Sequence, residues 1–123
     1  YAETIASLDL LASIPDLRLA LPGHGRPIDD VYGVTKMTRD GMVARLAACR
    51  EAIARGPAGA FELSERMLGP QPDFIKVSHL AEVMAYLRHL VLRGEAVREV
   101  DADGRHRYRL TEAGITALDG GTA

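Results

Sequence analysis

A single histidine stands between glycines and prolines early in the chain. The run is Pro22-Gly23-His24-Gly25-Arg26-Pro27, and it follows the apolar stretch Leu17 to Leu21, which is typical of a short buried strand. Glycine and proline on both sides of one histidine predict a tight, irregular loop. A residue just past the C-terminal end of a strand lies where α/β-type folds place ligands. His24 is therefore a candidate binding residue, although on the residues alone a histidine that satisfies its own loop is the commoner case.

The other residue types that could do chemistry are scattered. His79 and His89 are ten positions apart, which on a helix puts them about 80° off a common face, so they are not expected to share a metal. His106 lies in a predicted hairpin and is expected to be an exposed strand residue. Cys49 is the only cysteine, so it forms no internal disulfide, and in the middle of a predicted helix it is expected to be a small buried hydrophobe. The sequence offers no recognisable Ser-His-Asp or Cys-His frame and no phosphate-binding loop.

Three arginines, Arg105, Arg107 and Arg109, alternate along the last predicted strand and would share one of its faces. Such a row could contact nucleic-acid phosphates. Residues 94–110 nevertheless hold four arginines and four carboxylates, so a salt-bridged surface is the expected arrangement. Nucleic-acid binding stays as the alternative function.

Helices and turns must position these residues. Apolar residues recur at helical spacing over 2–13, which is ended by Pro15, and over 34–54, which is ended by Gly56-Pro57. A short helix is predicted over 60–68. Ser78 is the expected N-cap of the clearest helix, which ends at Gly94. The predicted buried stripe of this helix is Leu80, Val83, Met84, Leu87, Leu90 and Val91. The apolar side predicted for the 34–54 helix is Val34, Met37, Val43, Leu46, Ala47 and Ile53.

The last third of the chain predicts a hairpin and a short helix. Residues 96–100 and 105–110 alternate around an Asp-Gly turn, with Tyr108 and Leu110 expected to face inward, and residues 111–118 form the helix. From residue 34 onward the order is helix, helix, helix, hairpin, helix. This is the order of a winged helix-turn-helix.

Composition limits the function classes. The chain has 123 residues, 47% of them hydrophobic and 26% charged, with a net charge of −2, so one modest domain or a fragment joined to a small domain is expected. No basic excess points to nucleic acid. No apolar run is long enough for a membrane span and no signal peptide is apparent, so the predicted location is the cytoplasm.

The chain starts at Tyr1 in a helical pattern, which predicts that it begins inside a longer protein.

These features together resemble the metallo-β-lactamase superfamily, in its hydrolase-like members with a C-terminal winged-helix domain. The matching segments are Tyr1 with Ser7-Leu8, Leu21-Pro22-Gly23-His24-Gly25, Gly56-Pro57 with Phe61-Glu62-Leu63, Leu92-Arg93-Gly94, and the hairpin through Asp103-Gly104. The resemblance implies an α+β chain. Residues 1–32 would be the last helix-strand-loop piece of a metallo-β-lactamase αββα fold, 33–118 a winged-helix domain, and 119–123 a flexible tail.

The resemblance also implies a function. His24 would be a ligand of the second metal in a binuclear, usually zinc, site of a hydrolase, and the remaining ligands lie in motifs that these 123 residues lack. Two metals hold a hydroxide only with several protein ligands, so the chain alone is expected to bind no zinc and to be inactive. The expected partner is the missing N-terminal hydrolase domain. The sequence leaves open whether the chain forms a homodimer. Neither membrane contact nor sequence-specific DNA binding is expected. The winged helix would be a structural or substrate-shaping appendage, and the substrate (thioester, lactam, lactone or RNA phosphodiester) stays open.

Overall fold

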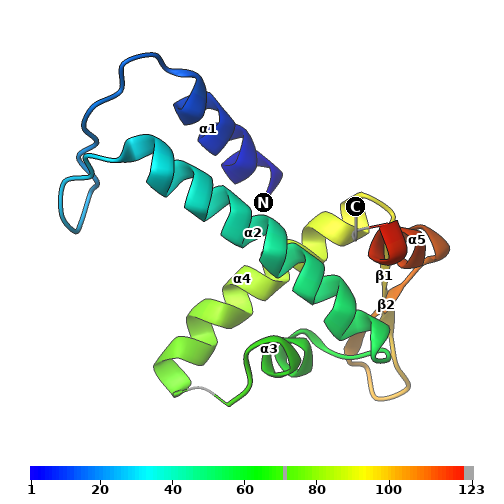
Figure 1. Ribbon diagram of the computed structural model, residues 1–123. Helices are drawn as coiled ribbons and strands as arrows, with labels where there is room; N and C mark the ends of the chain where they lie inside the picture. Colours follow the sequence, from blue (N-terminus) through cyan, green and yellow to red (C-terminus); the bar gives the residue numbers. More distant parts are fainter. Residues whose placement is uncertain (71, 121–123) are drawn as a thin grey trace. The chain divides into compact units, whose positions relative to one another are not determined.

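The structure is a computed structural model that describes residues 1–70 and 72–120 (Figure 1). It forms two compact units, Tyr1–Ala44 and Arg45–Ala123, and each is described by itself below. The elements in chain order are α1 (Ala2–Ser13), α2 (Val31–Ala54), α3 (Ala60–Leu68), α4 (Asp73–Leu92), β1 (Ala96–Val100), β2 (His106–Leu110) and α5 (Glu112–Gly120).

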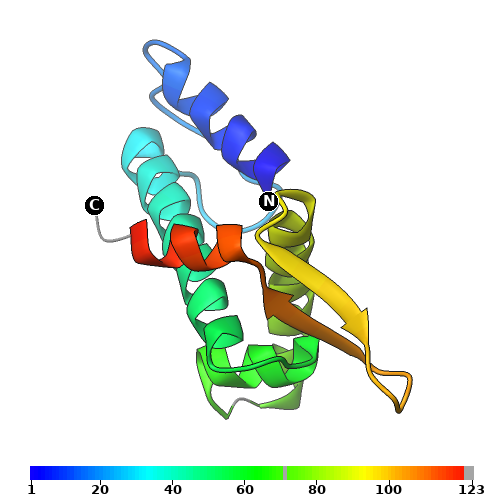
Figure 2. The ribbon, with the colours of Figure 1, turned by 90° about the vertical axis from the view of Figure 1, so that its right-hand side faces the viewer.

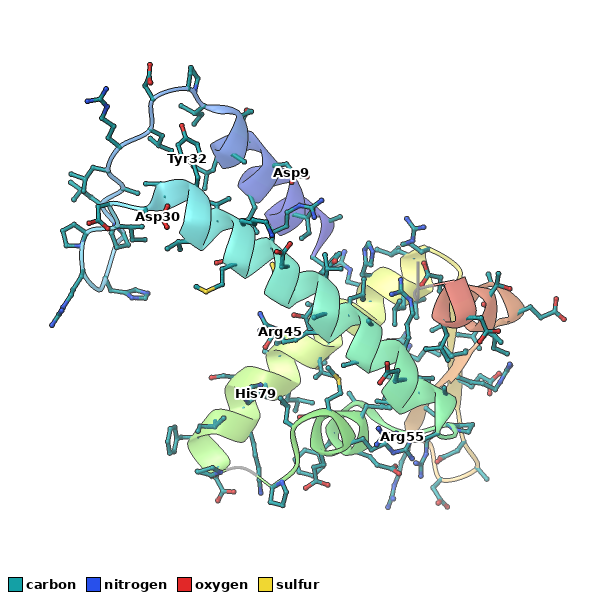
Figure 3. The ribbon with its side chains drawn as sticks, in the orientation of Figure 1. Asp9, Asp30, Tyr32, Arg45, Arg55 and His79 are labelled. Atoms are coloured by element: carbon teal, nitrogen blue, oxygen red, sulfur yellow. The ribbon has the colours of Figure 1, made fainter. Side chains whose placement is uncertain are left out.

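Polar contacts hold α1 to the start of α2 within the first unit. The helix α1 has the predicted bounds, yet none of its residues is buried. Arg39 of α2 donates to the Asp9 carboxylate at 2.7 Å. The hydroxyl of Tyr32 donates to the Ile14 carbonyl oxygen at 2.7 Å and accepts the Leu17 N–H at 3.0 Å (Figure 3 labels Asp9 and Tyr32). The amphipathic face predicted for α1 therefore finds no core within this unit.

The strand predicted over 17–21 is not formed. Only Ala20 makes a bridge, an antiparallel one with Ile28. A strand is stabilised by hydrogen bonds to a neighbouring strand, and among the described residues only this single pair supplies them. The prediction was therefore wrong for this chain, because an apolar run becomes a strand only where it has a partner.

Asp30 sets the start of α2, three residues earlier than predicted. Its side-chain oxygen accepts the N–H of Gly33 at 3.0 Å and its carbonyl accepts the N–H of Val34, which is the arrangement of an N-cap. The predicted apolar side is only partly buried. Leu46 and Ile53 are buried, whereas Met37, Val43 and Ala47 are exposed and Val34 is half-buried. Helical spacing shows which residues share a face, but burial also needs a neighbouring element on that face.

The core of the second unit is formed by the end of α2 together with α3, α4 and the hairpin, and α4 packs against both α3 and β1. Its fully buried side chains are Cys49, Leu63, Val83, Tyr86, Leu87 and Leu90. The helix α3 has the predicted bounds. The helix α4 begins at Asp73, five residues before the predicted cap at Ser78, which lies inside it. Pro72 precedes the first residue and lacks the N–H that a helix start would leave unsatisfied.

The buried face of α4 differs from the predicted stripe. Leu87 is fully buried, as predicted, together with Val83 and Leu90. Met84 is 53% exposed and Val91 is 36% exposed, so both were wrongly placed in the core. Tyr86, on the other flank of the buried face, belongs to the core instead, and its hydroxyl donates to Glu82 at 2.5 Å, which satisfies its polar atom.

The hairpin forms as predicted (Figure 2). Its strands pair from Ala96 opposite Leu110 to Val100 opposite His106, and a further bridge joins Ala58 to Tyr108. Leu110 is buried and Tyr108 is half-buried. At Gly114 in α5, a Cβ atom would lie 2.0 Å from the carbonyl oxygen of Glu95, so only glycine fits this approach.

The predicted flexible tail over 119–123 needs a correction. Asp119 and Gly120 belong to α5, because the hydrogen-bonded helix that begins at Glu112 continues through them. Residues 121–123 lie outside the described residues.

Candidate functional site

The loop that carries His24 is closed by one pair of backbone hydrogen bonds. Ala20 and Ile28 exchange their N–H and carbonyl groups at 2.9 Å, which holds the two ends of the loop together. Gly25 has a φ of +93°, a conformation that a residue with a side chain rarely adopts. The imidazole of His24 is exposed, and in the described part of the chain it makes no hydrogen bond. The loop therefore presents His24 outward, free to bind something from outside this chain.

The described residues do not complete a metal centre. They contain no group of three or more histidine, cysteine, aspartate or glutamate side chains that could hold a metal ion. A catalytic zinc takes three protein ligands and a structural zinc takes four. His24 can supply one of them, so the donor set found on residues 1–70 and 72–120 does not fit a whole zinc site.

The 123-residue chain is accordingly expected to hold no stoichiometric zinc at micromolar concentration, since one imidazole is a weak ligand by itself. Elemental analysis after dialysis against zinc-containing and zinc-free buffer measures this. One zinc retained per chain would contradict the prediction.

The remaining histidines and the cysteine are not arranged for catalysis. His79 lies beside a carboxylate, with its Nδ1 at 3.8 Å from Oε2 of Glu82 (Figure 3). Burial and the charge of Arg93 lower the pKa of His89, and His106 is exposed as predicted. Burial raises the pKa of the Cys49 thiol to about 12, so it stays protonated and unreactive.

Two of the three hairpin arginines are occupied by carboxylates. Arg107 contacts Glu62 at 3.0 Å and Asp101 at 3.1 Å, and Arg109 contacts Glu99 at 2.6 Å. Arg105 is exposed and forms no ion pair within residues 1–70 and 72–120. The structure thus brings two of these side chains into the kind of salt-bridged surface that the charge count predicted, rather than into a free basic row.

An open groove of about 830 Å³ lies between α4 and the hairpin, and sequence reasoning missed it because Met84 and Val91 were placed in the core. Its lining is mainly apolar, with two arginines, Arg88 and Arg98, that form no ion pair among the residues described. A signal was present, since α4 carries apolar residues on more than one side. The lining residues are Met84, Ala85, Arg88, Val91, Leu92, Gly94, Ala96, Val97, Arg98 and Tyr108.

Among the described residues, none of the helices combines the length and the apolar character that crossing a membrane requires.

Comparison with known proteins gives two kinds of match. A family model described as the metallo-beta-lactamase-like C-terminal domain matches residues 46–111. The crystal structure of a beta-lactamase domain protein from Burkholderia ambifaria is 31% identical, with a TM-score of 0.77 over 87% of this chain. That of a metallo-beta-lactamase family protein from Thermus thermophilus is 30% identical, with a TM-score of 0.70 over 87% of this chain. No curated protein matches.

The chain covers 32% of each of these two crystallised proteins, so it spans about a third of their length. The family model covers more than half of the present chain, and it includes α3, α4 and the whole hairpin. The chain therefore belongs to the metallo-beta-lactamase-like family and contains its C-terminal domain.

Proposed function

We propose that this chain is the C-terminal part of a cytoplasmic, zinc-dependent hydrolase of the metallo-β-lactamase fold. The observation that carries the proposal is the family match over 46–111 with the exposed His24 loop ahead of it. Because the chain covers 32% of its crystallised relatives, the other metal ligands and the substrate site belong to a preceding hydrolase domain. The substrate is one with a hydrolysable carbonyl or phosphate: a thioester, lactam, lactone or RNA phosphodiester.

In this proposal His24 is the residue of the chain that touches the metal centre. The metals, when bound, supply a hydroxide nucleophile near neutral pH. The closed loop between Ala20 and Ile28 holds the imidazole outward, and the turn at Gly25 lets the backbone bend sharply behind it. The contribution of the chain is thus to position one ligand.

We assign residues 33–118 to a winged-helix appendage with a structural or substrate-shaping role. The helix, helix, helix, hairpin, helix order supports this, and an isolated bridge between Ala58 and Tyr108 joins the segment before α3 to the edge of the hairpin. The paired Arg107 and Arg109 give little support to the nucleic-acid alternative, because their guanidinium groups already contact carboxylates.

Replacing His24 with alanine in the full-length protein tests the proposal. We expect the variant to lose about one of two metal ions per chain and its turnover to fall about 100-fold or more. Replacing a residue that only hydrogen-bonds to a metal ligand already lowers activity by up to about 100-fold, so loss of the ligand itself should cost at least as much. Metal analysis and hydrolysis of a panel of thioester, lactone, β-lactam and RNA substrates measure the two effects.

The matched control is His106→Ala, which removes an exposed histidine from β2 and should leave both readouts unchanged. If His24→Ala keeps the metal content and turnover of the wild type, His24 is only a loop residue and the proposed role fails.

A further inference from the structure

One exposed side of α4 is apolar except for Arg88. Residues that face away from the core recur at alternating intervals of three and four, the spacing of a helix–helix seam. Five of these six residues are apolar and all six are exposed; they are Phe74, Val77, Ala81, Met84, Arg88 and Val91, named here the outer face. Phe74 is 77% exposed and Val77 is 72% exposed.

The apolar surface of α4 extends well beyond its buried side. Val83, Leu87 and Leu90 fill the core, and the outer face runs from Met84 and Val91, beside Leu87, to Phe74 and Ala81 on the opposite side of the helix. A surface helix normally carries polar residues opposite its buried stripe, and a helix that is apolar all round is covered on both sides. A continuous exposed apolar surface marks a site of protein contact. The groove beside the hairpin extends this surface toward Val97 and Tyr108.

The charges on this surface are self-complementary. Arg88 lies toward the C-terminal end of α4 and forms no ion pair in the part of the chain that the structure describes. Asp73 is the first residue of α4, its side chain is 99% exposed, and it contacts Lys76 at 3.2 Å. Fifteen residues, or about 22 Å of helix, separate the cation from the anion. A second α4 turned end for end would place each charge beside its opposite.

We propose that the outer face of α4 is a homodimer interface on which a second copy of this chain docks antiparallel about a two-fold axis. In such a pair Phe74 lies opposite Val91, and Ala81 lies opposite Met84 near the axis, where the small alanine accommodates the longer side chain. Val77 packs on the stem of Arg88, whose guanidinium reaches Asp73 of the partner subunit. Two-fold symmetry repeats every contact, so the interface has two such ion pairs.

The mass of the chain in solution tests the proposal. At about 100 μM, sedimentation equilibrium should give twice the 13.3 kDa of one chain. Met84→Glu places a carboxylate at the centre of the interface and should give the mass of a single chain. Ile115→Glu, a matched change of an exposed apolar residue on α5, should leave the dimer intact.

A charge exchange tests the antiparallel register. Asp73→Arg and Arg88→Asp should each raise the dissociation constant about tenfold or more, because each places two pairs of like charges across the interface. The double variant restores opposite charges and should recover to within about threefold of the wild type. An arginine in the first turn of α4 destabilises the helix through its dipole, and this effect is the same in the single and the double variant. Recovery of the dissociation constant in the double variant therefore reports the ion pair between the two subunits.

Three results would overturn the proposal. One is a single-chain mass for the wild type at the same concentration, and another is a double variant as weak as its parents. The third is hydrogen exchange in the full-length protein that protects α4 while the protein stays monomeric, which would assign the outer face to the preceding polypeptide instead.

Discussion

Replacing Leu87 with alanine is expected to lower the free energy of unfolding by about 2–5 kcal/mol. Leu87 has no exposed surface and lies in the middle of α4, beside the buried Val83 and Leu90. The substitution removes apolar contacts and leaves a cavity that the surrounding helices fill only in part. Chemical denaturation followed by circular dichroism measures the change, which is a large part of the stability of a small domain.

Leu92→Ala is the matched control, because it is the same substitution in the same helix. Leu92 is 74% exposed at the end of α4, so its replacement should change the free energy of unfolding by about 0.5 kcal/mol or less. Equal effects of the two substitutions would show that α4 is not packed through the face that contains Leu87.

Replacing Glu95 with alanine is the second change with a large expected effect, about 3 kcal/mol of lost stability. The Glu95 carboxylate is almost fully buried and accepts hydrogen bonds from Nε of Arg50 and Nε of Arg93, both at 2.7 Å. Its carbonyl also accepts the N–H of Thr111, which ties the hairpin to the start of α5. Without the carboxylate, the guanidinium of Arg50, 17% exposed, would be left without this partner in a mostly buried place. The expected loss of about 3 kcal/mol is at the low end for a buried ion pair. The reason is that the Arg93 side chain is well exposed and can be solvated by water when the carboxylate is removed.

Glu99→Ala provides the comparison within the same hairpin. Glu99 contacts Arg109 at 2.6 Å, but both side chains are about half exposed, so loss of this pair should change stability by about 0.5 kcal/mol or less. A similar loss for both variants would mean that burial of Glu95 does not set the strength of its ion pairs.

The stability supplied by Glu95 should also depend on pH. Burial raises the pKa of Glu95, but the hydrogen bonds and charges of Arg50 and Arg93 outweigh burial and hold the pKa below its ordinary value of 4.5. The folded state therefore binds this proton less readily than the unfolded state does. The contribution is complete above pH 4.5 and is lost as the pH falls through the lower folded value. The stability difference between wild type and Glu95→Gln, measured from pH 7 down to about pH 3, should shrink over that range.

Local signals in the sequence predicted the elements well. The helices over 2–13 and 60–68 have the predicted bounds, and the hairpin turns at Asp101 to Gly104, where the Asp101 side chain accepts the N–H groups of Asp103 and Arg105. The resemblance carried by the His24 loop and the later segments predicted the family correctly. These features could be predicted because capping, turn formation and helical spacing depend on residues close together in the chain.

Features that depend on a neighbour could not be predicted in the same way. The apolar run at 17–21 did not become a strand because the described residues offer it only a bridge to Ile28. Ser78, predicted as the N-cap of α4, lies inside the helix because α4 begins at Asp73. The role of His24 in metal binding remains a prediction, since residues 1–70 and 72–120 contain no group of three or more donor side chains that could hold a metal ion.

The sequence by itself determined that residues 78–92 are helical and that both Met84 and Leu90 are apolar. Only the tertiary structure decided that Leu90 is buried against its neighbours and that Met84 is exposed on the outer face. It also decided that Glu95 lies beside Arg50, forty-five residues earlier in the chain. The physical reason is that hydrophobicity and charge belong to each residue, whereas burial and ion pairing are set by which distant elements pack against it.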